Sequence, residues 1–547
     1  MAMFRPLVAV IGIAIAFWFL PAPVNAEVEL VAAEEADPLT PKSVVSGPLK
    51  APGAPDTMPT PAAAAEHPVV TLVLQRLAEL AIRTRAGKED LEALAAFYTD
   101  NRGQPLWATP EGPNAKAKAA LDELALAPNY GLSSKAAYEV AIPANFATPE
   151  AQADFETSLS LALMTYARHA RGGRADPSRI SQLVDMRPHP FEPKSVVAAL
   201  AVADEPAAAL RRFHPQHDGF QRLQKALTAA RKSNASPDTI RRLEVNLERW
   251  RWMPDDLGAF HVRNNLPEQL TRVYDNGKVV LTEKIVIGKP SSPTPIMSAD
   301  MLLVIFHPSW GVPSGIKAGE VAPLLQRATQ RNKEWFSSND NASRALGRHQ
   351  LRVSINGHEI NPDSVDWTQT DIQRYEFSQP PSGQNVLGVV KFRFPNKHDV
   401  YMHDTPERNL FGAGLRAFSH GCMRVQNPIH LAQVILGHDK GWRPEKVQAF
   451  VPGGRSEDIT LTTPVPVHLT YFTAAVDDDG TLHTYGDVYG LDSRVASTLA
   501  GTNVNVASAG AEPDARHAER SSPRKRIDLA QAGKRPVEKA WNPFNGW

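Results

Sequence analysis

Apolar residues follow a helical period through the first patterned region of the chain, between residues 69 and 250. They return every three or four positions, as at Val70, Val73 and Leu77. That spacing gathers them on one face of a helix, where neighbouring helices can bury them. Stretches with the same period cover 114–127, 150–171, 195–212 and 218–232, and breakers such as Gly172-Gly173 separate them. The pattern predicts an α-helical domain over residues 69–250.

The period shortens towards two after residue 250, which is typical of β-strands. Residues 270–274 and 278–287 flank the tripeptide Asp275-Asn276-Gly277. An Asn-Gly pair supplies the positive φ angles that a tight turn needs, so we expect a hairpin here. Further strands are expected at 301–306, 389–394, 400–403 and 466–472.

A polar, partly helical stretch interrupts this β-rich region at about residues 324–385. Inserts of this size inside a β domain often act as lids over a site. We therefore predict an α+β multidomain chain. Its helical domain covers 69–250, and its β-rich domain covers 251–501 and carries the insert as a cap.

The two ends of the chain lack the pattern of a folded domain. An apolar run over 7–20 follows Arg5 and precedes a small-residue site ending at Ala26, which predicts a secretory signal peptide over 1–26. We expect export to the periplasm, with a membrane tether as the alternative if the signal stays uncleaved. Residues 27–68 hold 8 Pro and 9 Ala without an apolar period, so we expect a disordered tether there. Residues 502–547 are expected to form a disordered polar tail.

Composition narrows the classes of function. The 547 residues predict two or three domains, and the balance of 59 basic and 59 acidic residues argues against a nucleic-acid partner. The chain has one cysteine, Cys422. That excludes an intrachain disulfide and a multi-cysteine zinc site. Because an exported free thiol risks oxidation, a reactive function for Cys422 is favoured.

Histidines that could serve Cys422 as a base lie nearby in the sequence. His420 lies two residues before it, and His403 closes an expected strand 19 residues before it. Gly421 permits an unusual turn that would leave the amides of Gly421 and Cys422 free to bind an oxyanion. Arg424 could bind a substrate carboxylate or lower the pKa of the thiol.

Each of these residues also has an ordinary structural interpretation. Most histidines are surface or hydrogen-bonded groups, a lone cysteine is usually a small buried hydrophobe, and Arg424 could form a structural ion pair. The tetrapeptide Ser419-His420-Gly421-Cys422 should arise by chance about once in a thousand chains of this length. The cluster therefore carries more weight than any of its members.

The Ser-His-Gly-Cys-x-Arg motif and the preceding His403 resemble the signature of L,D-transpeptidases with a YkuD-type catalytic domain. The likeness extends to the large periplasmic subfamily typified by YcbB and covers roughly residues 85–500. It implies a helical scaffold domain before a β-sandwich. Its other segments are 246–251, 286–290, 294–295, 307–313, 387–392 and 401–406, with looser matches at 97–98, 107 and 130–132.

The resemblance implies a function for each site residue. Cys422 would be the nucleophile and His403 the general base, oriented by the main-chain carbonyl of Asp404. No metal or organic cofactor is implied, and carbapenems are expected to acylate the thiol. The remaining members would support the site, supply oxyanion donors or bind substrate, and they are His420, Ser419, Gly421, Tyr401 and Arg424.

The implied reaction is part of cell-wall biogenesis. A tetrapeptide stem of peptidoglycan would acylate the cysteine and release D-alanine, and an amine of a second stem would take the acyl group to give a 3→3 cross-link. A carboxypeptidase, in which water takes the acyl group, remains open, as do a non-catalytic wall scaffold and an outer-membrane protein as acceptor. The sequence between 227 and 243 lacks the peptidoglycan-binding module common in this subfamily, so the anchoring of sugar strands stays open.

Overall fold

The computed structural model describes residues 67–83, 87–100, 104–133, 135–187, 189–334 and 341–501. The predicted signal peptide, the tail after residue 501 and the tether up to residue 66 lie outside the described residues. Within the described ranges, no helix is both long and apolar enough to cross a membrane.

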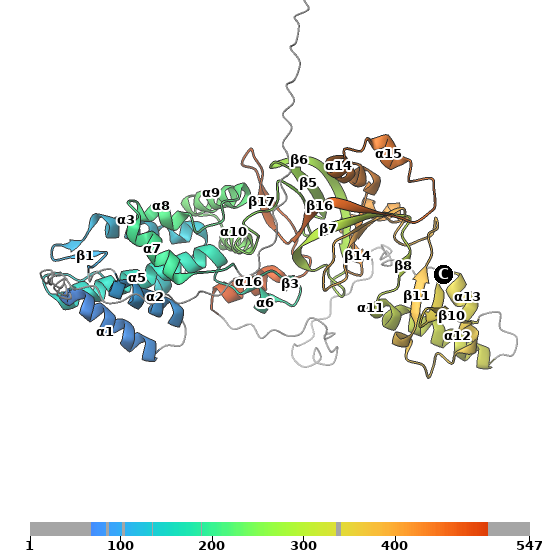
Figure 1. The fold of residues 1–547 in the computed structure, drawn as a ribbon, viewed down its shortest axis with the longest axis horizontal. Coiled ribbons are helices and arrows are strands. Elements are labelled where there is room, and N and C mark those ends of the chain that lie inside the picture. Colours follow the sequence, from blue (N-terminus) through green and yellow to red (C-terminus); the bar gives the residue numbers. More distant parts are fainter. Residues whose placement is uncertain are drawn as a thin grey trace, which may run out of the picture. The chain divides into compact units, whose positions relative to one another are not determined.

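The predicted helical region is confirmed (Figure 1). Most of its helices share one buried core, whereas those at residues 177–180, 218–232 and 237–250 contribute to the core of the sheet. One expected stretch, 195–212, divides into two helices, because Pro206 lacks an amide proton and starts a new helix. The helices are α1 (Pro68–Arg83), α2 (Lys88–Asp100), α3 (Ala115–Ala125), α4 (Lys135–Tyr138), α5 (Pro149–Gly172), α6 (Pro177–Ile180), α7 (Pro193–Val202), α8 (Pro206–Arg211), α9 (Asp218–Lys232) and α10 (Pro237–Trp250).

The β-rich domain is built on one ten-stranded sheet, and the expected hairpin is its β5–β6 pair. Asn276 and Gly277 have φ angles of 48° and 79°, as a tight turn requires. The strands are β3 (Val184–Asp185), β4 (Phe260–Asn265), β5 (Leu270–Asp275), β6 (Lys278–Gly288), β7 (Ile296–Phe306), β12 (Val390–Arg393), β13 (Met402–His403), β14 (Ala417–Ser419), β15 (Met423–Val425) and β16 (Glu457–Thr470).

This sheet closes on itself. Its strand order is β12-β13-β15-β6-β5-β4-β16-β7-β3, and β12 also pairs with β7. The first and eighth strands of the order therefore meet, and the inner faces of the sheet enclose one core. The resemblance implied a sandwich; here its two layers are parts of a single closed sheet. The strand β3 joins the outside of this ring from the helical part of the chain.

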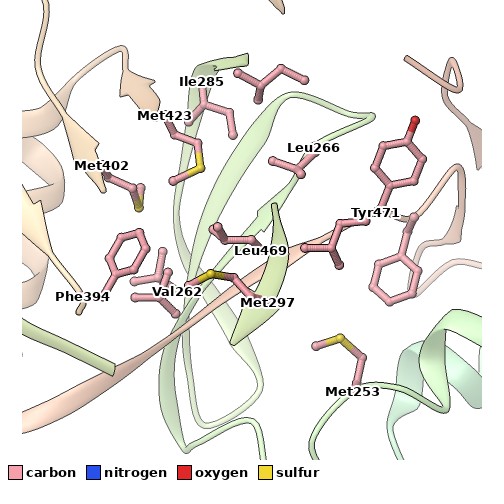
Figure 2. Close-up of a cluster of buried hydrophobic side chains, with 14 of the residues drawn as sticks. Met253, Val262, Leu266, Ile285, Met297, Phe394, Met402, Met423, Leu469 and Tyr471 are labelled. Carbon is pink, nitrogen blue, oxygen red and sulfur yellow. The ribbon is translucent and has the colours of Figure 1, made fainter. Parts of the chain in front are cut away.

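The core inside the sheet is rich in valine and leucine and also holds several methionines, with side chains from several strands pointing towards one another (Figure 2). Met402 of β13 lies directly opposite Met423 of β15, and both are fully buried. Because successive side chains of a strand point to opposite faces, the residue after each methionine faces away from this core. Those residues are His403 and Arg424.

The predicted insert is a small mixed subdomain that starts earlier than expected. It has its own four-stranded sheet, in the order β10-β9-β11-β8, and its own buried cluster. The strands were not predicted, because they are at most four residues long and their outward positions are polar. Its elements, which lie together in Figure 1, are β8 (Trp310–Gly311), α11 (Ser314–Ile316), η2 (Lys317–Val321), α12 (Ala322–Glu334), α13 (Ala342–Gly347), β9 (Arg352–Ile355), β10 (His358–Glu359), η3 (Pro362–Ser364), η4 (Ile372–Arg374) and β11 (Glu376–Gln379). We call residues 310–379 the cap.

Helix α10 joins the helical part to the sheet without a break in packing. Its Leu247 and Trp250 belong to the same buried cluster as the sheet residues. The fully buried Asn246 donates from Nδ2 to Thr473 Oγ1 (2.9 Å) and accepts from the Thr473 amide (2.8 Å). Thr473 precedes β17 (Ala474–Val476), which pairs with β18 (Leu482–Thr484). One side chain therefore ties the last scaffold helix to the end of the sheet.

Replacing Asn246 by Ala should lower the free energy of unfolding by about 2 kcal/mol, because the buried amide of Thr473 loses its partner. The midpoint of urea unfolding measures the change. The matched control is Lys225→Ala on the exposed face of α9, for which we expect a change below about 0.5 kcal/mol. An equal effect of both substitutions would refute this function of Asn246.

Candidate active site

Strand pairing brings three polar side chains into one row outside the sheet core. Lys391 of β12 lies opposite His403 of β13, and His403 lies opposite Arg424 of β15. Directly paired residues face the same side of a sheet, so these three share the face opposite Phe392, Met402 and Met423. The site is thus built on regular strands, with an imidazole between two cations.

His403 is buried, with 5% of its surface exposed, and its Nδ1 lies 2.5 Å from the carbonyl oxygen of Asp404. A carbonyl only accepts, so Nδ1 carries the proton and Nε2 is left as the basic nitrogen. Burial, together with the positive charges of Arg424 and Lys391, lowers the pKa of His403 to about 3, although the hydrogen bond to Asp404 acts in the opposite direction. The imidazole is therefore neutral at neutral pH.

The turn before the thiol is held by Ser419. Its hydroxyl donates to the carbonyl oxygen of Cys422 (2.5 Å) and accepts from the amide of Gly421 (3.2 Å). Gly421 has a φ angle of 116°, which favours glycine, and its carbonyl oxygen accepts from Thr294 Oγ1 (2.8 Å). The prediction that the Gly421 amide is free for an oxyanion is wrong, because Ser419 occupies it. The amide of Cys422 has no hydrogen-bond partner among the described residues.

The thiol of Cys422 is partly open to the pocket, yet protein surrounds most of it. Burial raises the pKa of this thiol to about 11, opposed by hydrogen bonds to the amide and hydroxyl of Tyr401 and by the charge of Lys391. The buried Tyr401 hydroxyl also accepts from the indole of Trp310. Lys391 Nζ lies 3.7 Å from the centre of the Tyr401 ring. In the resting state the cysteine is thus a neutral thiol.

One cavity of about 330 Å³ joins these groups. Cys422, His403 and Tyr401 lie along it, as do Ser419, His420 and Arg424. The cap supplies part of the wall through Trp310 and Ile316. The other lining residues are Ser292, Pro313, Gly315, Val386, Leu387, His398 and Asp399.

The carboxylate of Asp404 is structural. It accepts from the amides of Val389 (2.8 Å) and Thr405 (2.6 Å) and pairs with Arg408 (2.7 Å). Burial raises the pKa of this carboxyl group. Asp404 therefore fixes the loop, while its carbonyl oxygen orients His403.

Arg424 is buried and pairs with Glu407, with an N–O distance of 2.9 Å. Arg424 thus forms a structural ion pair, which was the alternative interpretation of this residue. Its binding to a substrate carboxylate stays a prediction. The positive charge of Arg424 also lowers the pKa of His403.

His420 lines the same cavity as His403 and contacts the cap. Its Nε2 lies 2.7 Å from Glu320 Oε1 and 3.1 Å from Lys289 Nζ. Glu320 is part of η2, a π-helical turn, and such turns occur often at functional sites. His420 therefore connects the Ser-His-Gly-Cys turn to the cap.

Comparison with known families agrees with this geometry. Residues 259–467 match the family model described as the L,D-transpeptidase catalytic domain, YkuD, and residues 92–227 match the one described as a scaffold domain. The chain contains a YkuD-type L,D-transpeptidase catalytic domain. Such a domain marks an acyl-transferring enzyme.

Two individual proteins are similar to parts of this chain. A Haemophilus influenzae protein named "Putative L,D-transpeptidase" is 25% identical over 412 residues, which make up 74% of this chain and 78% of that protein. A solved L,D-transpeptidase from Mycobacterium smegmatis is 13% identical, with a TM-score of 0.18, over 39% of this chain and 58% of the solved one. In the described residues of this chain, no group of three or more His, Cys, Asp or Glu could hold a metal ion.

Sequence reasoning did not predict Lys391, Trp310 and Glu320, which contact residues of the candidate site. Lys391 alternates with Val390 and Phe392, which indicates only that it faces away from the core. Its place beside His403 depends on the pairing of β12 with β13. Trp310 and Glu320 lie in the cap, whose fold was not predicted. Local sequence therefore carried no signal for their contacts.

Alkylation of Cys422 by iodoacetamide should rise about tenfold for each pH unit between 7 and 9, because only the thiolate reacts and its pKa lies near 11. The chain has one cysteine, so the intact-protein mass reports this thiol alone. A plateau that begins near pH 6 would instead indicate a preformed thiolate–imidazolium pair, against the neutral pair described above.

Replacing Lys391 by Met should slow this alkylation about tenfold at pH 8, if the thiol pKa rises by one unit on loss of the positive charge. Lys391→Arg keeps the charge and should alkylate at nearly the native rate. The two pH profiles, measured side by side, separate the charge of Lys391 from its packing on Tyr401. Equal rates for Lys391→Met and the native protein would show that the charge does not act on the thiol.

Proposed function

We propose that this protein is a peptidoglycan L,D-transpeptidase that forms 3→3 cross-links through a thioester on Cys422. The observation that carries the proposal is the meeting of a thiol, a neutral imidazole and a tyrosine hydroxyl in one cavity. Its substrates are the stem peptides of peptidoglycan, and the reaction has two halves.

In the first half, Cys422 attacks the carbonyl carbon of the bond between residues three and four of a tetrapeptide stem. His403 Nε2 takes the thiol proton as the sulfur attacks. Because the pKa of His403 is low and that of the thiol is high, proton transfer and attack are coupled rather than separate steps. The imidazolium then protonates the leaving amine, which departs as D-alanine.

The negative oxygen that develops during this attack needs hydrogen-bond donors. The Cys422 amide and the Tyr401 hydroxyl are the available donors beside the sulfur. The cation of Lys391 over the tyrosine ring adds a favourable field. Attack on a β-lactam carbonyl follows the same path, so carbapenems should inactivate the enzyme.

In the second half, an amine on another stem attacks the thioester, and His403 removes a proton from that amine. Water in place of the amine would make the protein an L,D-carboxypeptidase. The cap wall of Trp310 and Ile316 favours transfer, because it reduces the access of water to the thioester.

The apolar run and cleavage site at the N-terminus support export, so we place the enzyme in the periplasm. A thiol that rests protonated suits an oxidising compartment, because the thiolate is the form that oxidants attack.

Mass spectrometry of disaccharide-tetrapeptides incubated with the full chain tests the proposal. We expect a product of two stems joined with loss of one D-alanine, together with an acyl-enzyme at Cys422. Cys422→Ala should give neither species. His403→Gln should slow acylation by a factor of about 10² or more, since a neutral amide cannot take the proton.

Loss of D-alanine without a joined product would identify a carboxypeptidase instead. If native protein and Cys422→Ala give the same products, the site is not catalytic on this substrate, and a wall-associated scaffold becomes the better interpretation. A lysine-rich outer-membrane protein added as acceptor would reveal attachment of protein to the wall.

A further inference from the structure

A carboxylate with no assigned function lines the active-site cavity. Asp399 lies in the loop between β12 and β13, and its exposed side chain is part of the cavity wall with Cys422 and Tyr401. It has a φ angle of 52°, in the left-handed region. Asp tolerates that region better than most residues, though at some cost, and such positions cluster at functional sites.

The loop that presents Asp399 is held rigidly by Asn396. The Asn396 side-chain oxygen accepts from the amides of His398 (3.1 Å) and Val400 (3.2 Å). Its side-chain nitrogen donates to the carbonyls of Phe394 (2.7 Å) and Val400 (2.8 Å). Four hydrogen bonds from one side chain therefore fix the backbone on both sides of Asp399. The backbone that carries the carboxylate is thus in place at the cavity before any ligand arrives.

The basic side chains next to Asp399 in the loop make contacts elsewhere. Lys397 Nζ and His398 Nε2 both contact Asp185, at 2.7 and 3.1 Å. In the described part of the chain, the carboxylate of Asp399 makes no hydrogen bond or ion pair. It therefore faces the cavity without a hydrogen-bonded or ion-paired partner, although its charge interacts with that of Lys391 at longer range.

This charge opposes the first half of the proposed reaction. Burial is the largest cause of the raised pKa of the Cys422 thiol. Asp399 raises this pKa as well, whereas Lys391 lowers it. A carboxylate that hinders formation of a thiolate is a disadvantage unless it serves another step. The second half supplies such a step, because its nucleophile is a primary amine, which enters from water as an ammonium ion.

We propose that Asp399 binds the ammonium group of the acceptor and holds its nitrogen beside the thioester. The inference rests on the proposed function and names the acceptor class as a primary alkylammonium. Neutral amides and water can also donate a hydrogen bond to a carboxylate, but only the ammonium adds an opposite charge to the contact. Asp399 would thus help to select transfer over hydrolysis.

The step balances in atoms and charge. The bound ammonium gives one proton to water and becomes an amine, whose electron pair forms a C–N bond with the thioester carbon. His403 takes a second proton from that nitrogen, and the C–S bond breaks. The sulfur leaves with its electron pair and receives the proton from His403. The products are an amide, the neutral thiol and a proton in water.

The variant Asp399→Asn tests the proposal, because Asn also adopts the left-handed conformation and only the charge is lost. The probe is a disaccharide-tripeptide with a free side-chain amine, which lacks residue four and so cannot act as a donor. Its binding is measured by the protection of Cys422 from iodoacetamide. We expect half-protection of the variant to need about ten times more tripeptide than the native chain. The N-acetylated tripeptide should protect both proteins equally weakly.

Turnover gives a second readout on the same proteins. With a tetrapeptide donor and the tripeptide acceptor, the ratio of joined to hydrolysed product should fall about tenfold in Asp399→Asn, at an undiminished rate of D-alanine release. Deacylation by hydroxylamine, which is uncharged at neutral pH, should be unchanged. The matched control is Asp458→Asn. This exposed carboxylate raises the pKa of Lys391, as Asp399 does, but it does not line the cavity.

The outcomes separate the two proposals. Protection of the native chain by the tripeptide without any joined product would refute the proposed function and leave the ammonium site standing. Native cross-linking with equal protection and product ratio in Asp399→Asn would refute the ammonium site alone. An equal loss of donor acylation and acceptor use in the variant would also refute it, since Asp399 would then act on the fold of the site.

Discussion

The register between β12, β13 and β15 is the constraint on which the site depends. Met402 and Met423 face each other inside the closed sheet, and their burial fixes which residues are paired. The next residue along each strand must then face outwards, which places His403 beside Arg424. A shift of one residue would turn the imidazole into the core. The hydrophobic core therefore positions the imidazole that we propose as the base.

The same register determines the charge state of the site. His403 lies between two cations on a buried face, so protonation of the imidazole is unfavourable. Burial also disfavours the thiolate of Cys422, although Lys391 reduces that penalty. Both partners are therefore neutral at rest, and charge develops only when a carbonyl is present to share it. Donors fixed beforehand by the fold, such as the Cys422 amide, need no rearrangement at that moment.

Local signals in the sequence were enough for the helices, the β5–β6 hairpin and the residues of the Ser-His-Gly-Cys turn. They were not enough for contacts that depend on pairing between distant segments. Lys391 lies 31 positions before Cys422, and only the sheet brings it to the tyrosine beside the thiol. The engagement of the Gly421 amide by Ser419 likewise depends on the exact shape of a tight turn. The short strands of the cap were hidden by their polar outward positions.

In the reaction that we propose, the two opposite charges near one thiol serve two half-reactions with opposite needs. Formation of the thioester is helped by a positive charge near the sulfur, and Lys391 supplies it from a regular strand. Recruitment of a cationic acceptor is helped by a negative charge near the same carbon, and Asp399 lies on a loop at the cavity wall. Because the first charge acts on the protein's own thiol, it can be half-buried, whereas the second must be reached by a ligand from solvent. Lys391 is accordingly half-buried, and Asp399 is exposed.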